Sequence, residues 1–181
     1  MNFTPFPILK TNRLLLRKST LADRQEVFYL RSDAEVNKYI KREPMQKIEE
    51  AAAFINKIAK EIETGNSIEW SITLIGKKTV IGSVCIWNIN ESEMTGELGY
   101  SLMTKYHNKG IMTETIACVL DYGFNTMNLK LIDAYTHSEN KASIALLLKN
   151  GFIQNKNKVD EGNEHNLIFE STSENYIKHV D

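Results

Sequence analysis

Three consecutive strand-like segments constrain the fold of this 181-residue chain more than any other feature of its sequence. The segments IEWSITLIG (68–76), TVIGSVCIWNI (79–89) and MTGELGYSLM (94–103) are joined by the turn-like residues GKK and NESE, which is the pattern of β-hairpins. A loop and an apolar helix to about Met127 follow, and KLIDAYTHS (130–138) is a further strand. Hairpins combined with a strand–helix–strand unit predict an α/β fold with a mixed, twisted β-sheet.

The clearest helix of the chain begins near Ile48 and ends near Gly65. Isoleucine and alanine recur there with the i, i+3, i+4, i+7 spacing of an amphipathic helix. We find no internal repeat and no linker, so we expect one domain over residues 1–181. The other expected elements are a strand at 11–19, helices at 23–33 and 140–150, a short helix within 35–44, a strand pair within 152–159 and 164–171, and a polar tail from Ser171 that forms a short helix or frays.

Composition excludes several classes of function. Lys and Arg number 22 and Asp and Glu 23, so the chain lacks the basic excess that nucleic-acid binding needs. Neither a membrane-spanning apolar run nor an apolar signal core is present, and we expect a cytoplasmic protein that does not bind membranes. Cys85 and Cys118 are most simply small buried hydrophobes, with a catalytic nucleophile as the alternative. The cysteines and histidines lack metal-ligand spacing, so we expect no metal.

The loop YHNKGIMTET (106–115) connects the strand 94–103 to the start of a helix. Helix starts expose unpaired N–H groups at the positive end of the helix dipole, and they bind phosphates. Gly110 would let the backbone approach a ligand closely or adopt a positive φ angle. The loop has neither GK[ST] nor G-x-G-x-x-G, so an ordinary helix start is the alternative to a phosphate site.

Four separate stretches resemble the GNAT superfamily of acetyltransferases, and in particular its ribosomal-protein N-terminal acetyltransferase branch. The loop resembles that family's pyrophosphate-binding pattern of Gln or Arg, two residues, Gly, one residue, and Gly or Ala. His107 and Met112 depart from this pattern, whereas Gly110 keeps its central glycine. The other stretches are TNRLLLR near the N-terminus, GELGYSL (96–102) before the loop, and NKASIALLLKNGF (140–152). They occur in the family's order, and the resemblance extends over nearly the whole chain.

The resemblance implies an acetyl-coenzyme A (acetyl-CoA) cosubstrate and a splayed sheet with helices on both faces. In this family an amine attacks the thioester of acetyl-CoA directly, in a slot where two neighbouring strands separate. Here these strands correspond to 97–103 and 131–137. By resemblance, backbone N–H groups near Leu102 and Met103 would bind the pantetheine arm and polarise the thioester carbonyl. The remaining expected cofactor-binding residues are His107, Asn108, Lys109, Gly110, Ile111, Met112, Thr113 and Asn140, and Asn140 is alternatively a helix cap.

Glu97 is the candidate general base, through a water molecule. With the period of two of a strand, it shares a face with Gly99 and Ser101, while Leu98, Tyr100 and Leu102 face the other way. The two small residues beside the carboxylate leave room for a substrate. An ordinary surface glutamate is the alternative, and Asp133, Tyr135 and His137 on the next strand are rival candidates.

The candidate acid for the leaving thiolate is Ser143. Many GNAT enzymes use a tyrosine of the penultimate helix, but that place holds Leu147 here, which cannot donate a proton. The ribosomal-protein branch resembles this chain in carrying a serine one turn earlier, which corresponds to Ser143. A place in a helix N-terminal turn capped by Asn140 is the alternative for this serine.

The sequence leaves the acceptor open. An α-amino group of a protein or peptide is our leading acceptor, and a small-molecule amine is close behind. Because the tyrosine is missing and the loop pattern is altered, a non-catalytic acyl-CoA-binding sensor or assembly subunit is the alternative function. An unrelated α/β module whose loop binds nothing is a third. A homodimer is compatible with the family, although no segment demonstrates an interface.

Overall fold

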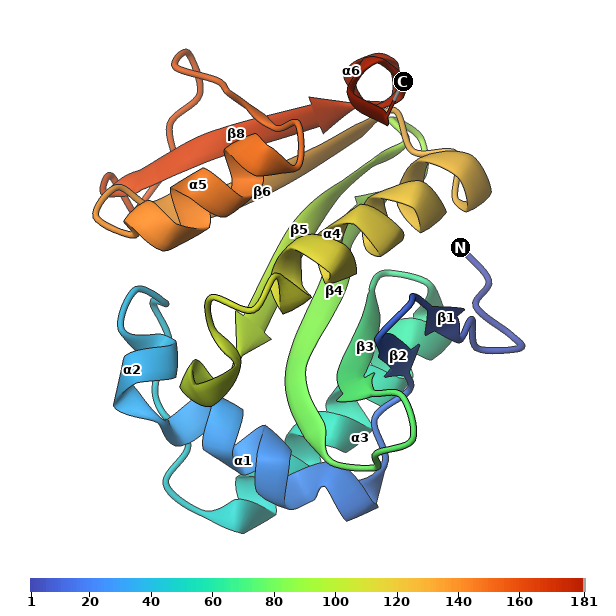
Figure 1. Cartoon of the computed structure of the whole chain (residues 1–181), viewed down its shortest axis with the longest axis vertical. Coiled ribbons are helices and arrows are strands. Elements are labelled where there is room, and N and C mark those ends of the chain that lie inside the picture. Colours follow the sequence, from blue (N-terminus) through green and yellow to red (C-terminus); the bar gives the residue numbers. More distant parts are fainter. Residues whose placement is uncertain (181) are drawn as a thin grey trace.

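The computed structural model describes residues 1–180, and the side-chain surroundings of residues 1–176. An open, eight-stranded sheet has the strand order β1-β2-β3-β4-β5-β6-β8-β7 (Figure 1). Neighbouring strands are antiparallel except for the parallel pair β5 and β6, so the sheet is mixed as predicted. The strands are β1 (Leu9–Lys10), β2 (Leu14–Arg17), β3 (Ile68–Leu74), β4 (Val80–Asn90), β5 (Thr95–Leu102), β6 (Leu131–His137), β7 (Ile153–Gln154) and β8 (Asn166–Thr172).

Six α-helices accompany the sheet within the described residues 1–180: α1 (Arg24–Ser32), α2 (Ala34–Asn37), α3 (Ile48–Thr64), α4 (Ile111–Asp121), α5 (Lys141–Lys149) and α6 (Ser173–Val180). The predicted limits of α3 are confirmed, and Gly65 ends the helix in the left-handed conformation with a φ of 77°. The predicted helix to Met127 is confirmed as α4 followed by a π-helical turn at Tyr122–Thr126. None of the helices in residues 1–180 has the length and apolar character required to cross a bilayer.

Two predicted strands are shorter than expected because side chains form turns with the backbone. In the segment 11–19, the hydroxyl of Thr11 accepts a hydrogen bond from the N–H of Leu14 at 3.0 Å, so the chain turns before β2. In the segment 152–159, the side chain of Asn155 accepts from the N–H of Asn157 at 2.9 Å, and this Asx turn ends β7 after two residues. The short helix expected within 35–44 is α2, which lies in the first part of that segment.

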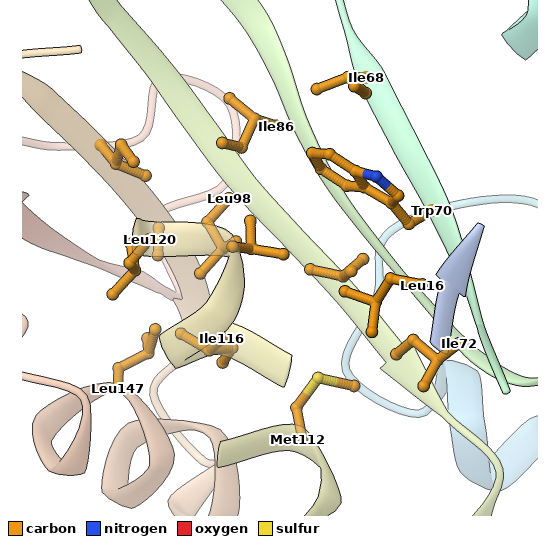
Figure 2. Packing of buried hydrophobic residues seen from close by; sticks show 14 of the residues in the cluster. Leu16, Ile68, Trp70, Ile72, Ile86, Leu98, Met112, Ile116, Leu120 and Leu147 are labelled. Carbon is orange, nitrogen blue, oxygen red and sulfur yellow. The ribbon is translucent and has the colours of Figure 1, made fainter. Parts of the chain in front are cut away.

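The sheet has one apolar face and one polar face. In Figure 1, α4 and α5 lie in front of the sheet, and their buried side chains pack against alternate residues of the central strands (Figure 2). This core includes Leu16, Trp70, Ile72, Ile86, Leu98, Met112, Ile116, Leu120 and Leu147. The intervening strand residues, such as Glu69, Cys85 and Glu97, point to the opposite face because strand side chains alternate.

The strands β5 and β6 separate partway along their length. Register pairs connect Thr95–Leu98 of β5 to Leu131–Ala134 of β6 and end there. Tyr100 and Leu102 on β5, and Tyr135 and His137 on β6, therefore lie beyond the paired part. The predicted splay is present, and it leaves a gap between two central strands of the sheet.

Candidate functional site

One edge of β5 faces this gap. The N–H of Met103 donates to the carbonyl of Ile81 at 2.9 Å, so odd-numbered residues of this strand pair with β4. In an antiparallel pair the intervening residues turn their N–H and C=O groups the other way. The backbone groups of Tyr100 and Leu102 therefore face the gap. Of the two predicted donors, Leu102 fits the role, whereas the N–H of Met103 is already engaged in the sheet.

The loop after β5 has the geometry of an anion site. Gly110 is the N-cap of α4 with a φ of 70°, and Asn108 also has a positive φ, 59°. The first intrahelical bond of α4 runs from the N–H of Glu114 to the carbonyl of Gly110, which leaves the N–H groups of the first turn directed outward. The side chains of Ile111 and Met112 are buried in the core. These two residues can thus offer a ligand only their backbone.

The remaining loop residues are at least partly accessible to solvent, and His107 is exposed. Asn108 and Lys109 are exposed and Thr113 is half-buried. Nε2 of His107 lies 2.9 Å from the carbonyl oxygen of Leu102, so the ring points back toward the end of β5. In this geometry His107 caps a carbonyl that faces the gap, and its side chain does not extend along the α4 N-terminus.

A cluster of polar contacts fixes the start of α4 against the turn before β2. The carboxylate of Glu114 accepts from the hydroxyl of Thr11 at 2.5 Å and from the backbone and side chain of Arg13 at 3.0 and 2.6 Å. The guanidinium of Arg13 also donates to the carbonyl of Lys109 at 2.9 Å. Two of the four stretches on which the family resemblance rests, TNRLLLR and the loop 106–115, are therefore held together by these contacts.

Glu97 lies beside the gap on the polar face. Its Oε1 accepts a hydrogen bond from the amide of Asn88 at 2.6 Å, and its register partner on β6 is Asp133. Burial raises the pKa of Glu97, the Asn88 bond opposes this shift, and the negative charges of Asp133 and Asp160 add to it. Within the described part of the chain, this carboxylate forms no ion pair. It is held in place and remains able to accept a proton.

The rival bases have other partners. Lys158 forms ion pairs with Asp133 at 3.1 Å and with Glu170 at 2.7 Å. The ring of His137 lies between the rings of Tyr39 and His165, with centroid distances of 5.5 Å to each. Tyr135 is partly exposed on the same face. Of these groups, Asp133 is nearest to Glu97 in the sheet register, but its negative charge is balanced by a lysine.

Three hydroxyl groups meet on the other face of the sheet. The hydroxyl of Ser143 lies 2.7 Å from that of Tyr100 and accepts from that of Thr136 at 2.8 Å. Burial raises the pKa of Tyr100 to about 12, which keeps its hydroxyl protonated. Because Tyr100 belongs to β5 and Thr136 to β6, this chain of hydroxyls connects the two strands beyond the point where they separate.

The neighbours of Ser143 on α5 have structural roles. Oδ1 of Asn140 accepts from the N–H of Ser143 at 3.1 Å, so Asn140 caps α5, as the alternative interpretation predicted. Leu147, at the position where the family resemblance implies a tyrosine, is fully buried in the apolar core. A proton donor on α5 near the gap must therefore come from the first turn of this helix.

Sequence reasoning missed the partners of Ser143 and a group of charges on the polar face. The guanidinium of Arg31 lies 3.9 Å from the ring centroid of Phe54, and Arg31, Arg42 and Glu69 line one small pocket. Burial raises the pKa of Glu69 to about 7. The sequence signal for this group of charges was Glu69, a charged residue inside the otherwise apolar strand segment 68–76.

Burial also raises the pKa of the thiols of Cys85 and Cys118, which disfavours a nucleophilic role for either cysteine.

Comparison with known proteins identifies the family of this chain. The model of the GNAT acetyltransferase domain matches residues 13–153. The uncharacterised N-acetyltransferase YoaA of Bacillus subtilis (strain 168) is 35% identical over 147 residues, which cover 81% of this chain and 83% of YoaA. A spermidine N(1)-acetyltransferase of Vibrio cholerae is 24% identical over 150 residues, or 83% of this chain and 84% of that protein.

Solved structures agree with this match. A GNAT-family acetyltransferase from Bacillus anthracis is 29% identical with a TM-score of 0.77, covering 93% of this chain and 99% of that one. The ribosomal-protein-S5-alanine acetyltransferase from Vibrio fischeri has the same fold, with a TM-score of 0.76, 18% identity and coverage of 94% and 98%. The matched domain includes the gap, the Gly110 loop and Ser143. The chain belongs to the GNAT acetyltransferase family, and the protein is an acetyl-CoA-dependent acetyltransferase.

Proposed function

We propose that this protein transfers an acetyl group to a primary amine by direct attack of the amine on the thioester, with Glu97 as general base and Ser143 as the group that assists the leaving sulfur. One observation carries this proposal. Glu97 and the hydroxyl of Ser143 lie on opposite faces of the sheet beside the same gap between β5 and β6. A proton acceptor and a proton donor are thus available on the two sides of one slot.

The first half of the reaction would take place on the polar face. An ammonium ion loses one proton to Glu97, directly or through a water, and the neutral nitrogen then forms a bond to the acyl carbon. The N–H of Leu102, which faces the gap, is suited to stabilise the negative charge that develops on the acyl oxygen. Acetyl-CoA supplies the activated acyl group, and N–H groups of residues 111–113 at the start of α4 are suited to hold its pyrophosphate.

The second half would take place on the apolar face. The carbon–sulfur bond breaks, and the sulfur takes one proton to become a thiol, while the product nitrogen gives up its second proton. Ser143 would donate a hydrogen bond to the sulfur and draw on Tyr100 and Thr136 through the bonds between their hydroxyls. A thiol of reference pKa near ~8.5 is a good leaving group at neutral pH, so modest assistance is sufficient.

The acceptor we favour is the α-amine of a protein or peptide, followed by a small-molecule amine. An α-amine has a pKa near ~7.7–8.0 and a lysine side chain one near ~10.4, so deprotonating the lysine at neutral pH costs about 3 kcal/mol more. A single half-buried carboxylate is better matched to the α-amine. The names of the relatives include both a spermidine and a ribosomal-protein acetyltransferase, so they do not choose between these acceptors.

A test is to incubate the protein with acetyl-CoA and a panel of amines and to follow release of the free thiol. The panel would contain short peptides with free N-termini, spermidine, and a peptide with a blocked N-terminus and an internal lysine. We expect thiol release with the free N-termini, and at least tenfold slower release with the internal lysine. Acetylation of the blocked peptide at the same rate would overturn the choice of acceptor, and no turnover on any amine would contradict the proposed reaction.

A further inference from the structure

A second feature of the polar face lies at the open end of the gap. An open cavity of about 540 Å³ is lined by residues 38–41 after α2, by His137 at the end of β6, and by residues 162–165. Its volume falls within the range of roughly 300–1,000 Å³ that is typical of small-ligand sites. Nζ of Lys41 donates to the carbonyl of Gly162 at 2.8 Å and connects the two walls. This cavity is separate from the Gly110 loop and from Glu97.

The charges around the cavity are mostly positive. Lys38 and Lys41 line it, and neither forms an ion pair with a carboxylate of the described residues. Glu164 is the acidic lining residue. The rings of Tyr39, His137 and His165 form one wall, and Nδ1 of His137 accepts from the N–H of Glu139 at 3.1 Å. Nε2 of His137 is therefore the ring nitrogen that carries a proton and can donate.

The cavity and Glu97 lie on the same face of the sheet, and the strand register gives the distance between them. Asp133 is the register partner of Glu97, and His137 is four residues further along β6 with the same orientation. At about 3.3 Å per residue, four residues span about 13 Å, and the two residues from Tyr135 to His137 span about 7 Å. His137 at the cavity therefore lies about 13 Å along β6 from the level of the Glu97 and Asp133 carboxylates, and about 7 Å from Tyr135, next to the point where the strands separate.

We infer that the acceptor carries an anionic group, a carboxylate or a phosphate, which binds in the cavity between Lys38, Lys41 and His137 while its amine lies at the gap. This inference rests on the proposed acetyl transfer and names the class of acceptor for it. A free α-amino acid is too short, because one carbon separates its amine from its carboxylate. An extended peptide with an acidic third residue has a suitable span, since each residue extends it by about 3.3 Å. A small ω-amino carboxylate of similar length also fits.

The test compares acceptors that differ only in this charge. The tetrapeptide amide Ser-Ala-Asp-Ala would be compared with Ser-Ala-Asn-Ala, and 8-aminooctanoate with octylamine, all at saturating acetyl-CoA. We expect kcat/KM to be about tenfold higher for the anionic member of at least one pair, because a charge-assisted contact is lost in the other. A preference within the peptide pair alone would identify a peptide acceptor, and one within the other pair alone a small molecule.

Variants of the cavity lysines then test whether the preference for the anionic acceptor arises in the cavity. In the double variant Lys38→Gln, Lys41→Gln the preference should fall to about twofold or less, with an unchanged KM for acetyl-CoA. Both lysines are exposed, so the fold should be retained. The matched control is Lys57→Gln, Lys60→Gln on the exposed side of α3, which should keep the wild-type preference.

Two results would overturn the inference. The first is that the wild type uses the charged and neutral acceptors equally well. The second is that the Lys38, Lys41 variant keeps the preference for the anionic acceptor. If the KM for acetyl-CoA is raised in that second case, the cavity would be assigned to a phosphate of the coenzyme. If no amine is turned over, the acetyl-transfer proposal fails by itself. Calorimetric titration of the two peptides then decides the inference, and equal affinities would refute it.

Discussion

The two faces of the sheet have different compositions and different tasks. On the face covered by α4 and α5, strand residues such as Trp70, Ile86 and Leu98 pack with the helices into the largest buried apolar cluster of the described residues. On the opposite face the same strands carry Glu69, Glu97 and Asp133, and the small cluster of Val27, Ala51 and Ile55 lies between α1 and α3. The first face holds most of the buried apolar core, and the second carries the charged groups that the proposed reaction uses.

The gap between β5 and β6 connects these two environments. A thioester held there would have the polar face on the side of the attacking amine and the apolar face on the side of the departing sulfur. An ammonium ion requires a carboxylate and water, whereas a thiolate leaves readily with weak hydrogen-bond assistance. The difference between the two faces therefore corresponds to the difference between the two halves of the proposed reaction.

The largest expected effect is on stability and concerns the apolar face. Ile116 of α4 is fully buried, and we expect Ile116→Ala to lower the free energy of unfolding by about 2–5 kcal/mol. For a chain of this size that corresponds to a melting temperature lower by roughly 10 °C. Ser101→Ala, on the polar face, is the comparison variant. Its free energy of unfolding, followed by thermal denaturation, should fall by no more than about 1 kcal/mol. Equal losses would mean that both faces stabilise the fold alike.

The second-largest expected effect is the fall in activity when the proposed base on the polar face is removed. We expect Glu97→Gln to lower kcat by about 10²-fold with little change in stability. Glu97 acts as a carboxylate, and its pKa lies above the ordinary value, mainly because of burial. The wild-type rate should therefore fall as the pH is lowered through this raised pKa, and the variant should lack that acidic limb.

Asp133→Asn is the matched control for Glu97→Gln. The Asp133 carboxylate is already paired with Lys158, which keeps its second partner Glu170 in the variant. We expect less than a tenfold loss of kcat from this change. A loss as large as that of Glu97→Gln would transfer the role of the base to Asp133 or to the pair.

A third effect concerns coenzyme binding at the α4 N-terminus. Saturating acetyl-CoA, at about 100 times its Kd, should stabilise the wild type by about 2.7 kcal/mol, or roughly 5–10 °C in a thermal melt. Gly110→Val should abolish this rise, because a side chain is strained at a φ of 70° and obstructs the loop.

Gly76→Val separates strain from binding. Gly76 in the β3–β4 turn has a φ of 76°, and an added Cβ there would meet no atom within 4 Å. This variant should have a similar backbone cost of about 1–2 kcal/mol but keep the full response to acetyl-CoA. A normal response in Gly110→Val would remove the loop from the site.

The smallest expected effect is that of the hydroxyl group on the apolar face. We expect Ser143→Ala to lower kcat about tenfold, with the KM for acetyl-CoA nearly unchanged, because the thiolate needs little assistance. Tyr100→Phe should give a smaller loss of the same kind, since its hydroxyl reaches the sulfur only through Ser143. Stopped-flow measurement of thiol release would test both. If Tyr100→Phe has the larger effect on kcat, Tyr100 would be the donor to the sulfur and Ser143 would position its hydroxyl.

Local patterns were sufficient for much of the fold. The spacing of isoleucine and alanine gave the limits of α3, and the turn residues between the central strands gave both hairpins. The alternation of GELGYSL correctly placed Glu97 and Leu98 on opposite faces. The ends of β2 and β7 were not predicted correctly, because side chains of Thr11 and Asn155 compete with strand pairing there.

The sequence by itself determined the α/β order, the two-faced strands, the glycine at the start of α4 and the identity of the groups that the proposed reaction uses. These depend on residues that are neighbours in the chain. Only the tertiary structure decided where β5 and β6 separate, that Tyr100 and Thr136 meet Ser143, and that Lys38 and Lys41 meet His137 around one cavity. Those contacts join residues that are far apart in sequence, and they depend on how the helices pack on the two faces of the sheet.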